Sequence, residues 1–146
     1  MPKKIILLVE DNPDDVLLVQ RALKRANIAN EIVHAKDGVE AINYFDGKGA
    51  FANREPVMPE VMLLDLKLPR LSGLEVLKKL RARNDTRLLP IVILTSSKED
   101  RDLVASYEFG ANSFVSKPVD FMKFAEAVQQ LGLYWLLLNR PAPQNG

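Results

Sequence analysis

The sequence has no cysteine and only one histidine and one tryptophan among its 146 residues. Without cysteine the chain forms no disulfide bond and no thiolate metal site. Neither charge is in excess, because 20 Lys and Arg side chains face 19 Asp and Glu side chains and the net charge is +1. This balance gives no reason to expect nucleic acid or an anionic membrane as the main partner, so any charge-based function is local.

Long apolar runs are missing as well. The run Ile5–Val9 is followed at once by Glu10, so it is far shorter than the apolar region of a usual signal peptide. Residues 131–138 are apolar on all sides but too few to cross a bilayer. We therefore expect a soluble, cytoplasmic protein with one domain, since the length suffices for one hydrophobic core and not for two.

Short apolar runs alternate with amphipathic stretches along the chain. The runs predict strands over residues 5–9, 31–35, 61–64, 91–94 and 113–115. Helices are predicted from Pro13 to about Ala26, over 38–45, 73–83 and 97–109, and from near Asp120 onward, with a long loop over 46–59. Continuous apolar strands that alternate with helices predict a parallel sheet covered by helices on both faces.

Residues suited to phosphate and magnesium stand at four of these strand ends. They are Glu10 with Asp11, then Asp65, then Thr95, then Lys117 with Pro118. Because parallel strands all end at one edge of the sheet, these side chains are expected to share one crevice. Carboxylates that meet there repel one another and need a cation, and oxygen ligands suit Mg²⁺. The hydroxyl and the ammonium suit the oxygens of a phosphoryl group.

Each of these residues taken alone also has an ordinary structural interpretation. A pair of carboxylates after a strand is often part of a helix cap, and Asp14 and Asp15 are expected to interact with the helix dipole in this way. Asp65 is of a type common in turns, and Lys117 is of a type common on solvated surfaces. Their convergence at one sheet edge favours the functional interpretation.

In the order and spacing of these residues, residues 3–128 resemble the receiver domain of two-component response regulators. The bacterial chemotaxis response regulator is the best-known single-domain member of that family. The run from Asp65 to Pro69, followed by Gly73, is itself distinctive of receivers. The resemblance implies a flavodoxin-like, doubly wound α/β fold with a five-stranded parallel sheet in the order 2-1-3-4-5. Residues 1–130 would form the receiver, and residues 131–146 an extension of the last helix with a polar tail.

The resemblance also implies a role for each site residue. The implied roles are a phosphoacceptor (Asp65), a switch hydroxyl (Thr95), an aromatic switch (Phe114), a phosphate-binding lysine (Lys117), a cis peptide bond (Lys117–Pro118), and ligands of Mg²⁺ (Asp11, Asp65, the backbone carbonyl of Lys67 and, largely through water, Glu10). No enzymatic activity is implied beyond the protein's own phosphorylation and dephosphorylation.

The implied partners are proteins. A sensor histidine kinase would supply the phosphoryl group, and a downstream protein would bind the switched surface. The insertion over residues 46–59 and the apolar stretch over 131–138 resemble single-domain regulators that partner phytochrome-type kinases. Since a receiver's last helix needs only one buried stripe, the surplus apolar surface favours a homodimer with Tyr134, Trp135 and Leu138 at its interface. The alternative interpretation is that this stretch is ordinary core.

Three other functions fit the sequence less well. An aspartate-nucleophile phosphatase needs a second Asp two positions after the nucleophile, and this chain has Lys67 there. A pseudo-receiver that only binds partners usually lacks one of the acidic, Thr or Lys positions, and none is missing. A flavin-binding protein of this fold needs a phosphate loop after the first strand, where the acidic residues here would repel phosphate. His34 lies within a strand pattern and is expected to be structural.

Overall fold

The computed structural model of the chain describes residues 4–25, 28, 30–55, 57–96, 98–99 and 113–130. Its elements are β1 (Ile5–Val9), α1 (Pro13–Arg25), β2 (Glu31–Ala35), α2 (Gly38–Asp46), the 3-10 helix η1 (Gly49–Phe51), β3 (Val61–Asp65), α3 (Gly73–Arg81), β4 (Ile91–Thr95), β5 (Ser113–Ser116) and α5 (Phe121–Gln130). The helix predicted over 97–109 lies outside the described residues except for Lys98 and Glu99. In the described part of the chain, no helix has the length and apolar character needed to cross a membrane.

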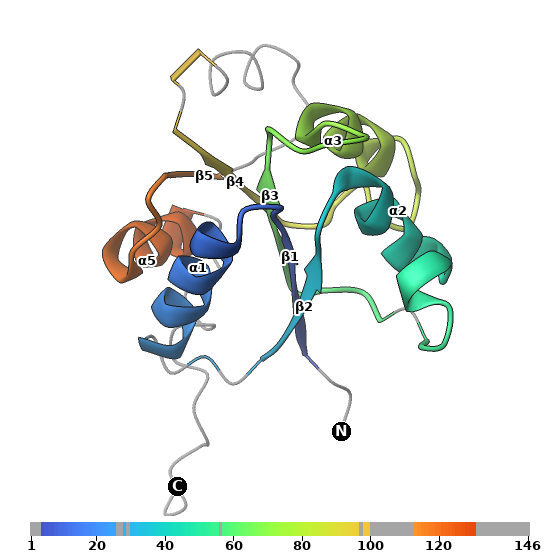
Figure 1. Ribbon diagram of the computed structural model, residues 1–146, viewed down its shortest axis with the longest axis horizontal. Coiled ribbons are helices and arrows are strands. Elements are labelled where there is room, and N and C mark those ends of the chain that lie inside the picture. Colours follow the sequence, from blue (N-terminus) through green and yellow to red (C-terminus); the bar gives the residue numbers. More distant parts are fainter. Residues whose placement is uncertain are drawn as a thin grey trace, which may run out of the picture.

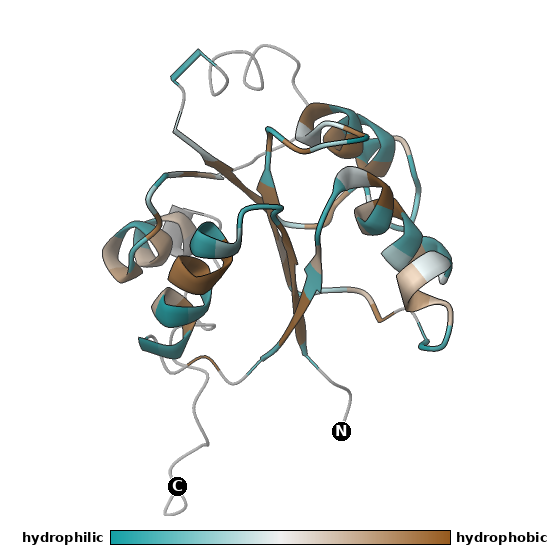
Figure 2. Ribbon diagram, viewed as in Figure 1, coloured by the Kyte–Doolittle hydropathy of each residue, from teal (hydrophilic) through white to brown (hydrophobic). Residues whose placement is uncertain are grey.

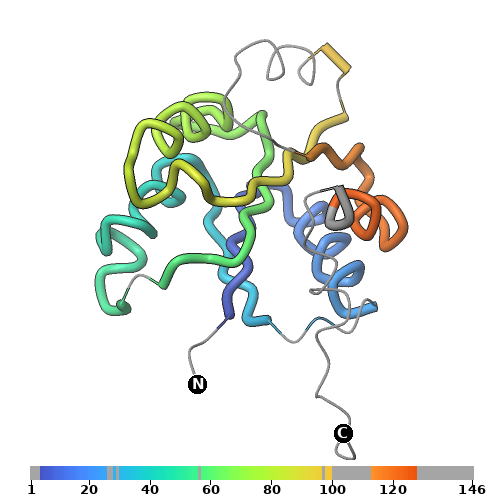
Figure 3. Tube along the Cα trace, turned by 180° about the vertical axis from the view of Figure 1, so that it is seen from behind, coloured from blue at the N-terminus to red at the C-terminus, as the bar shows by residue number. Residues whose placement is uncertain are grey.

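The strands form one five-stranded parallel sheet in the order β2-β1-β3-β4-β5, which confirms the predicted fold. Helices α1 and α5 lie on one side of this sheet and α2 and α3 on the other (Figure 1), and the view from behind shows the same division (Figure 3). The register sets Asp65 of β3 opposite Leu94 of β4, and Thr95 opposite Ser116 of β5. The carboxyl ends of the strands are therefore level at one edge.

Two hydrophobic layers hold the sheet. Every residue of β1, β3 and β4 is buried, and alternate residues belong to opposite layers. The central strands are mostly hydrophobic and are brown in Figure 2. In β1, Leu7 packs in the layer with α2 and α3, whereas Leu8 packs in the layer with α1 and α5. Full burial of such a side chain stabilises the fold by about 1.5–3 kcal/mol. The packed sheet therefore holds the residues at its carboxyl edge in fixed positions.

Short polar signals start the helices as expected. Asn12 caps α1, because its Oδ1 accepts hydrogen bonds from the backbone N–H groups of Asp14 (2.8 Å) and Asp15 (3.2 Å). Ser72 caps α3 by accepting from the N–H of Glu75 at 3.2 Å. α3 ends at Arg81 rather than at the predicted position 83, because the following residues form turns that are closed by hydrogen bonds back onto α3.

The insertion over residues 46–59 has more structure than a loop pattern predicts. It contains η1, whose Phe51 is buried with its ring edge-on to Tyr44, at 5.3 Å between ring centroids. The hydroxyl of Tyr44 donates a hydrogen bond to the carbonyl of Val57. The ring of Phe51 and the hydrogen bond to Val57 thus hold the insertion against Tyr44 of α2.

Candidate functional site

The acidic residues of two strand ends come together at the edge of the sheet. Glu10 and Asp11 follow β1, Asp65 is the last residue of β3, and carboxylate oxygens of all three lie within 4.8 Å of one another. Glu10 is fully buried and Asp65 is 4% exposed, whereas Asp11 is exposed. Two buried carboxylates beside an exposed one form a set of oxygen ligands that solvent can reach.

Lys117 reaches these carboxylates from the end of β5. Its backbone N–H donates to the carbonyl of Thr95 at 3.1 Å, which fixes the start of the turn, and its peptide bond to Pro118 is cis. The ammonium Nζ donates a hydrogen bond to Oδ2 of Asp65 at 2.9 Å. The predicted phosphoacceptor and the predicted phosphate-binding lysine are therefore in direct contact.

Two further carboxylates share this ammonium. Nζ of Lys117 donates to Oδ2 of Asp15 at 3.0 Å and lies 2.8 Å from Oε1 of Glu10. The Glu10 contact is an ion pair, although its geometry is not that of a hydrogen bond. One ammonium faces a cluster of three carboxylates, so the site has negative charge to spare and is suited to a divalent cation.

The charge state of the site follows from its burial. Burial, the largest cause, and the neighbouring Asp65 raise the pKa of Glu10 to about 7, although Lys117 and the N–H of Asn12 pull it down. Burial alone lowers the pKa of Lys117, but the adjoining carboxylates outweigh it and keep that pKa above its ordinary value. Without a metal, Lys117 is therefore charged throughout the neutral range, while Glu10 titrates within it.

The loop after Asp65 is folded back tightly against the strand end. The N–H of Lys67 donates to Oδ1 of Asp65 at 3.1 Å, and the N–H of Gly73 donates to the carbonyl of Leu66 at 2.9 Å. A Cβ added at Gly73 would lie 2.1 Å from the backbone oxygen of Asp65. Only glycine fits there, which gives a physical reason for the spacing between Asp65 and Gly73.

The same loop is attached to the start of α2. Arg70 has a left-handed backbone (φ 67°), and its Nη1 lies 3.2 Å from Oδ2 of the buried Asp37, which also caps α2. Gly38 lies beneath the loop, where an added Cβ would come within 1.9 Å of the carbonyl oxygen of Leu71. The loop that carries Lys67 is therefore positioned by contacts with the start of α2 and by the hydrogen bond from Gly73, the first residue of α3.

The two predicted switch residues lie on neighbouring strands. Thr95 ends β4, is 4% exposed and lies one position beyond the register partner of Asp65. Phe114 is partly buried and packs against the core layer shared with α2 and α3. The predicted dimer residues Tyr134, Trp135 and Leu138 lie outside the described residues.

Asp15 is a site residue that the sequence analysis missed, because its place in the first turn of α1 was explained by the helix dipole alone. The first turn of α1 brings its carboxylate to Lys117, 102 positions along the chain. No local pattern signals this contact, which depends on how α1 packs against the end of β5. His34 is structural, as expected: its Nε2–H donates to the carbonyl of Glu10 at 2.6 Å and holds the end of β1.

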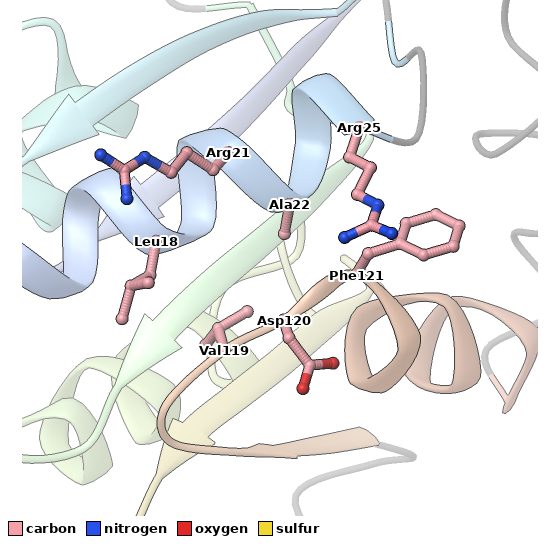
Figure 4. Close-up of a pocket in the computed structure, with 7 residues that line it drawn as sticks. All are labelled: Leu18, Arg21, Ala22, Arg25, Val119, Asp120 and Phe121. Carbon is pink, nitrogen blue, oxygen red and sulfur yellow. The ribbon is translucent and has the colours of Figure 1, made fainter.

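A hollow between α1 and α5 is a second candidate site (Figure 4). The guanidinium of Arg25 lies over the ring of Phe121, 5.9 Å from its centroid. The one carboxylate there, of Asp120, accepts a hydrogen bond from the N–H of Lys123 at 2.9 Å and caps α5. Because that carboxylate already has a structural role, the acidic cluster is the stronger candidate. The hollow is lined by Leu18, Arg21, Ala22, Arg25, Val119, Asp120 and Phe121.

Comparison with known proteins gives a consistent set of relatives. The chain is 36% identical over 135 residues to response regulator Rcp1 of Synechocystis sp., a match that covers 92% of this chain and 90% of that protein. The solved structure of the bacteriophytochrome response regulator AtBRR superposes with a TM-score of 0.87 at 50% identity, covering 96% of this chain and 100% of that one.

Two further structures represent different states of relatives. The Mn(2+)-bound form of Rcp1 matches with a TM-score of 0.73 at 35% identity, over 96% of this chain and 99% of that one. The phosphorylated cyanobacterial phytochrome response regulator RcpA matches with a TM-score of 0.73 at 32% identity, over 97% and 100%. Such proteins are in general signalling proteins rather than enzymes.

The model of the response regulator receiver domain matches residues 6–129. Apart from Ile5, the first residue of β1, the match includes all five strands, and it includes every residue of the acidic cluster. The chain therefore belongs to the response regulator receiver domain family.

Proposed function

We propose that this chain accepts a phosphoryl group on Asp65 from the phosphohistidine of a sensor histidine kinase and signals through phosphorylation-dependent contacts with a downstream protein. One observation carries the proposal: the carboxylate of Asp65 is in direct contact with the ammonium of Lys117 and lies beside Glu10 and Asp11. Asp65 belongs to the acidic cluster, contacts an ammonium and is the last residue of a strand. No other carboxylate in the described part of the chain meets all three conditions.

The geometry gives each group a part in the transfer. An oxygen of Asp65 attacks phosphorus, the bond from phosphorus to the imidazole nitrogen of the kinase breaks, and the imidazole leaves with the bonding electrons. The ammonium of Lys117 offsets the negative charge on the phosphoryl oxygens. The N–H of Lys67, bonded to Oδ1, orients the carboxylate. Beyond this self-phosphorylation and the later loss of the phosphoryl group, we propose no enzymatic activity.

We propose that the site holds Mg²⁺ through Asp11, Asp65 and the carbonyl oxygen of Lys67, with Glu10 acting largely through water. The close grouping of three carboxylates and the exclusively oxygen-based ligand set support this choice. When bound, a divalent cation would neutralise carboxylate charge and polarise the phosphoryl oxygens. The relative Rcp1 has been solved in a form that binds Mn(2+), which is also a divalent cation.

The metal proposal leads to a measurable stabilisation. Mg²⁺ at about a hundredfold above its Kd is expected to stabilise the fold by about 2.7 kcal/mol, because it binds only the folded state. Asp11→Ala should remove most of the rise in melting temperature, measured by circular dichroism with and without MgCl₂. Asp14→Ala is the matched control, because Asp14 is exposed and lies outside the cluster. An Asp11→Ala response equal to that of the control would exclude Asp11 as a ligand.

For the output, we propose that Thr95 and Phe114 couple the phosphoryl group to a partner surface. Thr95 would turn toward the phosphoryl oxygens, and Phe114 would move further into the core layer that it already touches. The kinase is proposed to be of the phytochrome type, supported by the similarity to AtBRR and RcpA and by the ordered insertion. We propose that this exchange takes place in the cytoplasm.

We also propose a homodimer through residues 131–138, because their apolar side chains exceed what one receiver core needs to bury. A two-fold axis would place the same segment on both sides of the contact. Analytical ultracentrifugation should show a dimer at micromolar concentration for the parent chain and a monomer for the double variant Trp135→Glu, Leu138→Glu. Should the parent sediment as a monomer both with and without phosphorylation, the dimer proposal is wrong.

A further inference from the structure

The ammonium of Lys117 contacts three carboxylates before any phosphoryl group arrives. A lysine has three N–H donors. One is used on Asp65 at 2.9 Å and one on Asp15 at 3.0 Å, and the ammonium also lies 2.8 Å from Glu10. Of these three carboxylates, Asp15 alone lies outside the cluster that is suited to a metal. Its charge therefore acts at the site chiefly through Lys117.

We propose that Asp15 is a positioning residue that restrains Lys117 and slows phosphoryl transfer to Asp65, an inference that rests on the function proposed above. When an oxygen of Asp65 bonds to phosphorus, that carboxylate becomes an acyl phosphate and loses its own charge. Lys117 then has to donate to a phosphoryl oxygen. The carboxylate of Asp15 takes no part in the new bond and continues to attract one donor toward α1.

The neighbouring Asp14 provides an unusually close control. Both residues lie in the first turn of α1, and both donate their backbone N–H to Oδ1 of Asn12. Both carry the same charge near the same helix dipole. They differ in placement: Asp14 is exposed, whereas the side chain of Asp15 is 20% exposed and contacts Lys117. A difference between substitutions at the two positions therefore reports the contact with Lys117.

The first experiment measures the rate of phosphorylation by acetyl phosphate with saturating MgCl₂. An oxygen of Asp65 forms the new bond to phosphorus, the bond from phosphorus to the acetate oxygen breaks, and acetate leaves with the bonding electrons. Asp15→Asn is expected to react about fivefold faster than the parent, near the upper limit for a partly exposed ion pair. Asp14→Asn should stay within about twofold of the parent, as for a surface charge without a partner.

The second experiment is a double-mutant cycle on the free energy of unfolding in urea, without metal or phosphate. Asp15→Asn and Lys117→Met should be non-additive, because each removes the same contact, whereas Asp14→Asn and Lys117→Met should be additive. This readout does not depend on phosphorylation and keeps the inference testable if the rates are hard to separate.

The outcomes are distinguishable. Faster labelling of Asp15→Asn together with a non-additive cycle supports the restraint. Equal rates for Asp15→Asn and Asp14→Asn, a slower Asp15→Asn variant or an additive cycle would each overturn it while the parent still takes phosphate on Asp65. A parent that takes no phosphate on Asp65 refutes the proposed function itself, and the inference falls with it.

Discussion

Replacing Lys117 with methionine is expected to destabilise the metal-free protein by about 3 kcal/mol, because loss of one partner leaves buried charges uncompensated. The buried carboxylates of Glu10 and Asp65 would then share the pocket without the ammonium that lies within 3 Å of both. The measurement is urea unfolding followed by circular dichroism. Lys79→Met, an exposed lysine on α3, is the control and should change stability little.

The pH dependence of this effect identifies its cause. The pKa of Glu10 is raised from 4.5 to about 7 in the folded protein, so between these values the folded state binds more protons than the unfolded state. Stability of the metal-free protein therefore falls as pH rises through this interval. Without Lys117, which lowers the pKa of Glu10, the penalty should be larger above the interval and small below it. An equal penalty above and below would show that carboxylate repulsion is not responsible.

Replacing Gly73 with alanine is expected to cost more than about 3 kcal/mol, as for other severe overlaps in a packed interior. The added Cβ would lie 2.1 Å from the oxygen of Asp65 and 2.5 Å from Cα of Leu66. Both atoms belong to the backbone, so no side-chain rotation relieves the overlap. The strand end that carries the phosphoacceptor has to move instead, and the affinity for Mg²⁺ should fall with stability.

Gly47→Ala is the matched control for this second substitution. Gly47 ends α2 with a left-handed backbone (φ 64°), so its replacement costs about 1 kcal/mol through backbone conformation alone. Urea unfolding and a Mg²⁺ titration of both variants separate the two causes. If Gly73→Ala is no less stable than Gly47→Ala and binds Mg²⁺ as the parent does, the close approach at Gly73 does not position Asp65.

The sheet and its edge were predictable because their signals are local. The continuous apolar runs of β1, β3 and β4 require burial on both faces, and a parallel sheet with helices on each side provides it. The order of such strands brings Asp65 and Lys117 to one edge, so their meeting followed from the topology. The structure of the insertion was not predicted, because Phe51 acquires its role only when its ring meets Tyr44.

The electrostatics of the site were only partly predictable. The sequence indicates that carboxylates gather, but the pKa of Glu10 depends on its complete burial, which no residue pattern specifies. The second function of Asp15 likewise depends on tertiary packing, since its helix-dipole role explains its place in the sequence without Lys117. The sequence therefore does not predict the electrostatic contacts between side chains that are far apart in the chain, such as that of Asp15 with Lys117.

Peptide mapping by mass spectrometry after incubation with acetyl phosphate and MgCl₂ tests the central claim most directly. The parent should gain one base-labile phosphoryl group, located on Asp65, because that carboxylate combines a nucleophilic oxygen with Lys117 and the acidic cluster. Asp65→Asn should gain none. Asp120→Asn, which alters a helix-capping carboxylate outside the cluster, should label like the parent. An Asp65→Asn variant that keeps the label, or a parent that never acquires it, would contradict the assignment of Asp65 as the phosphoacceptor.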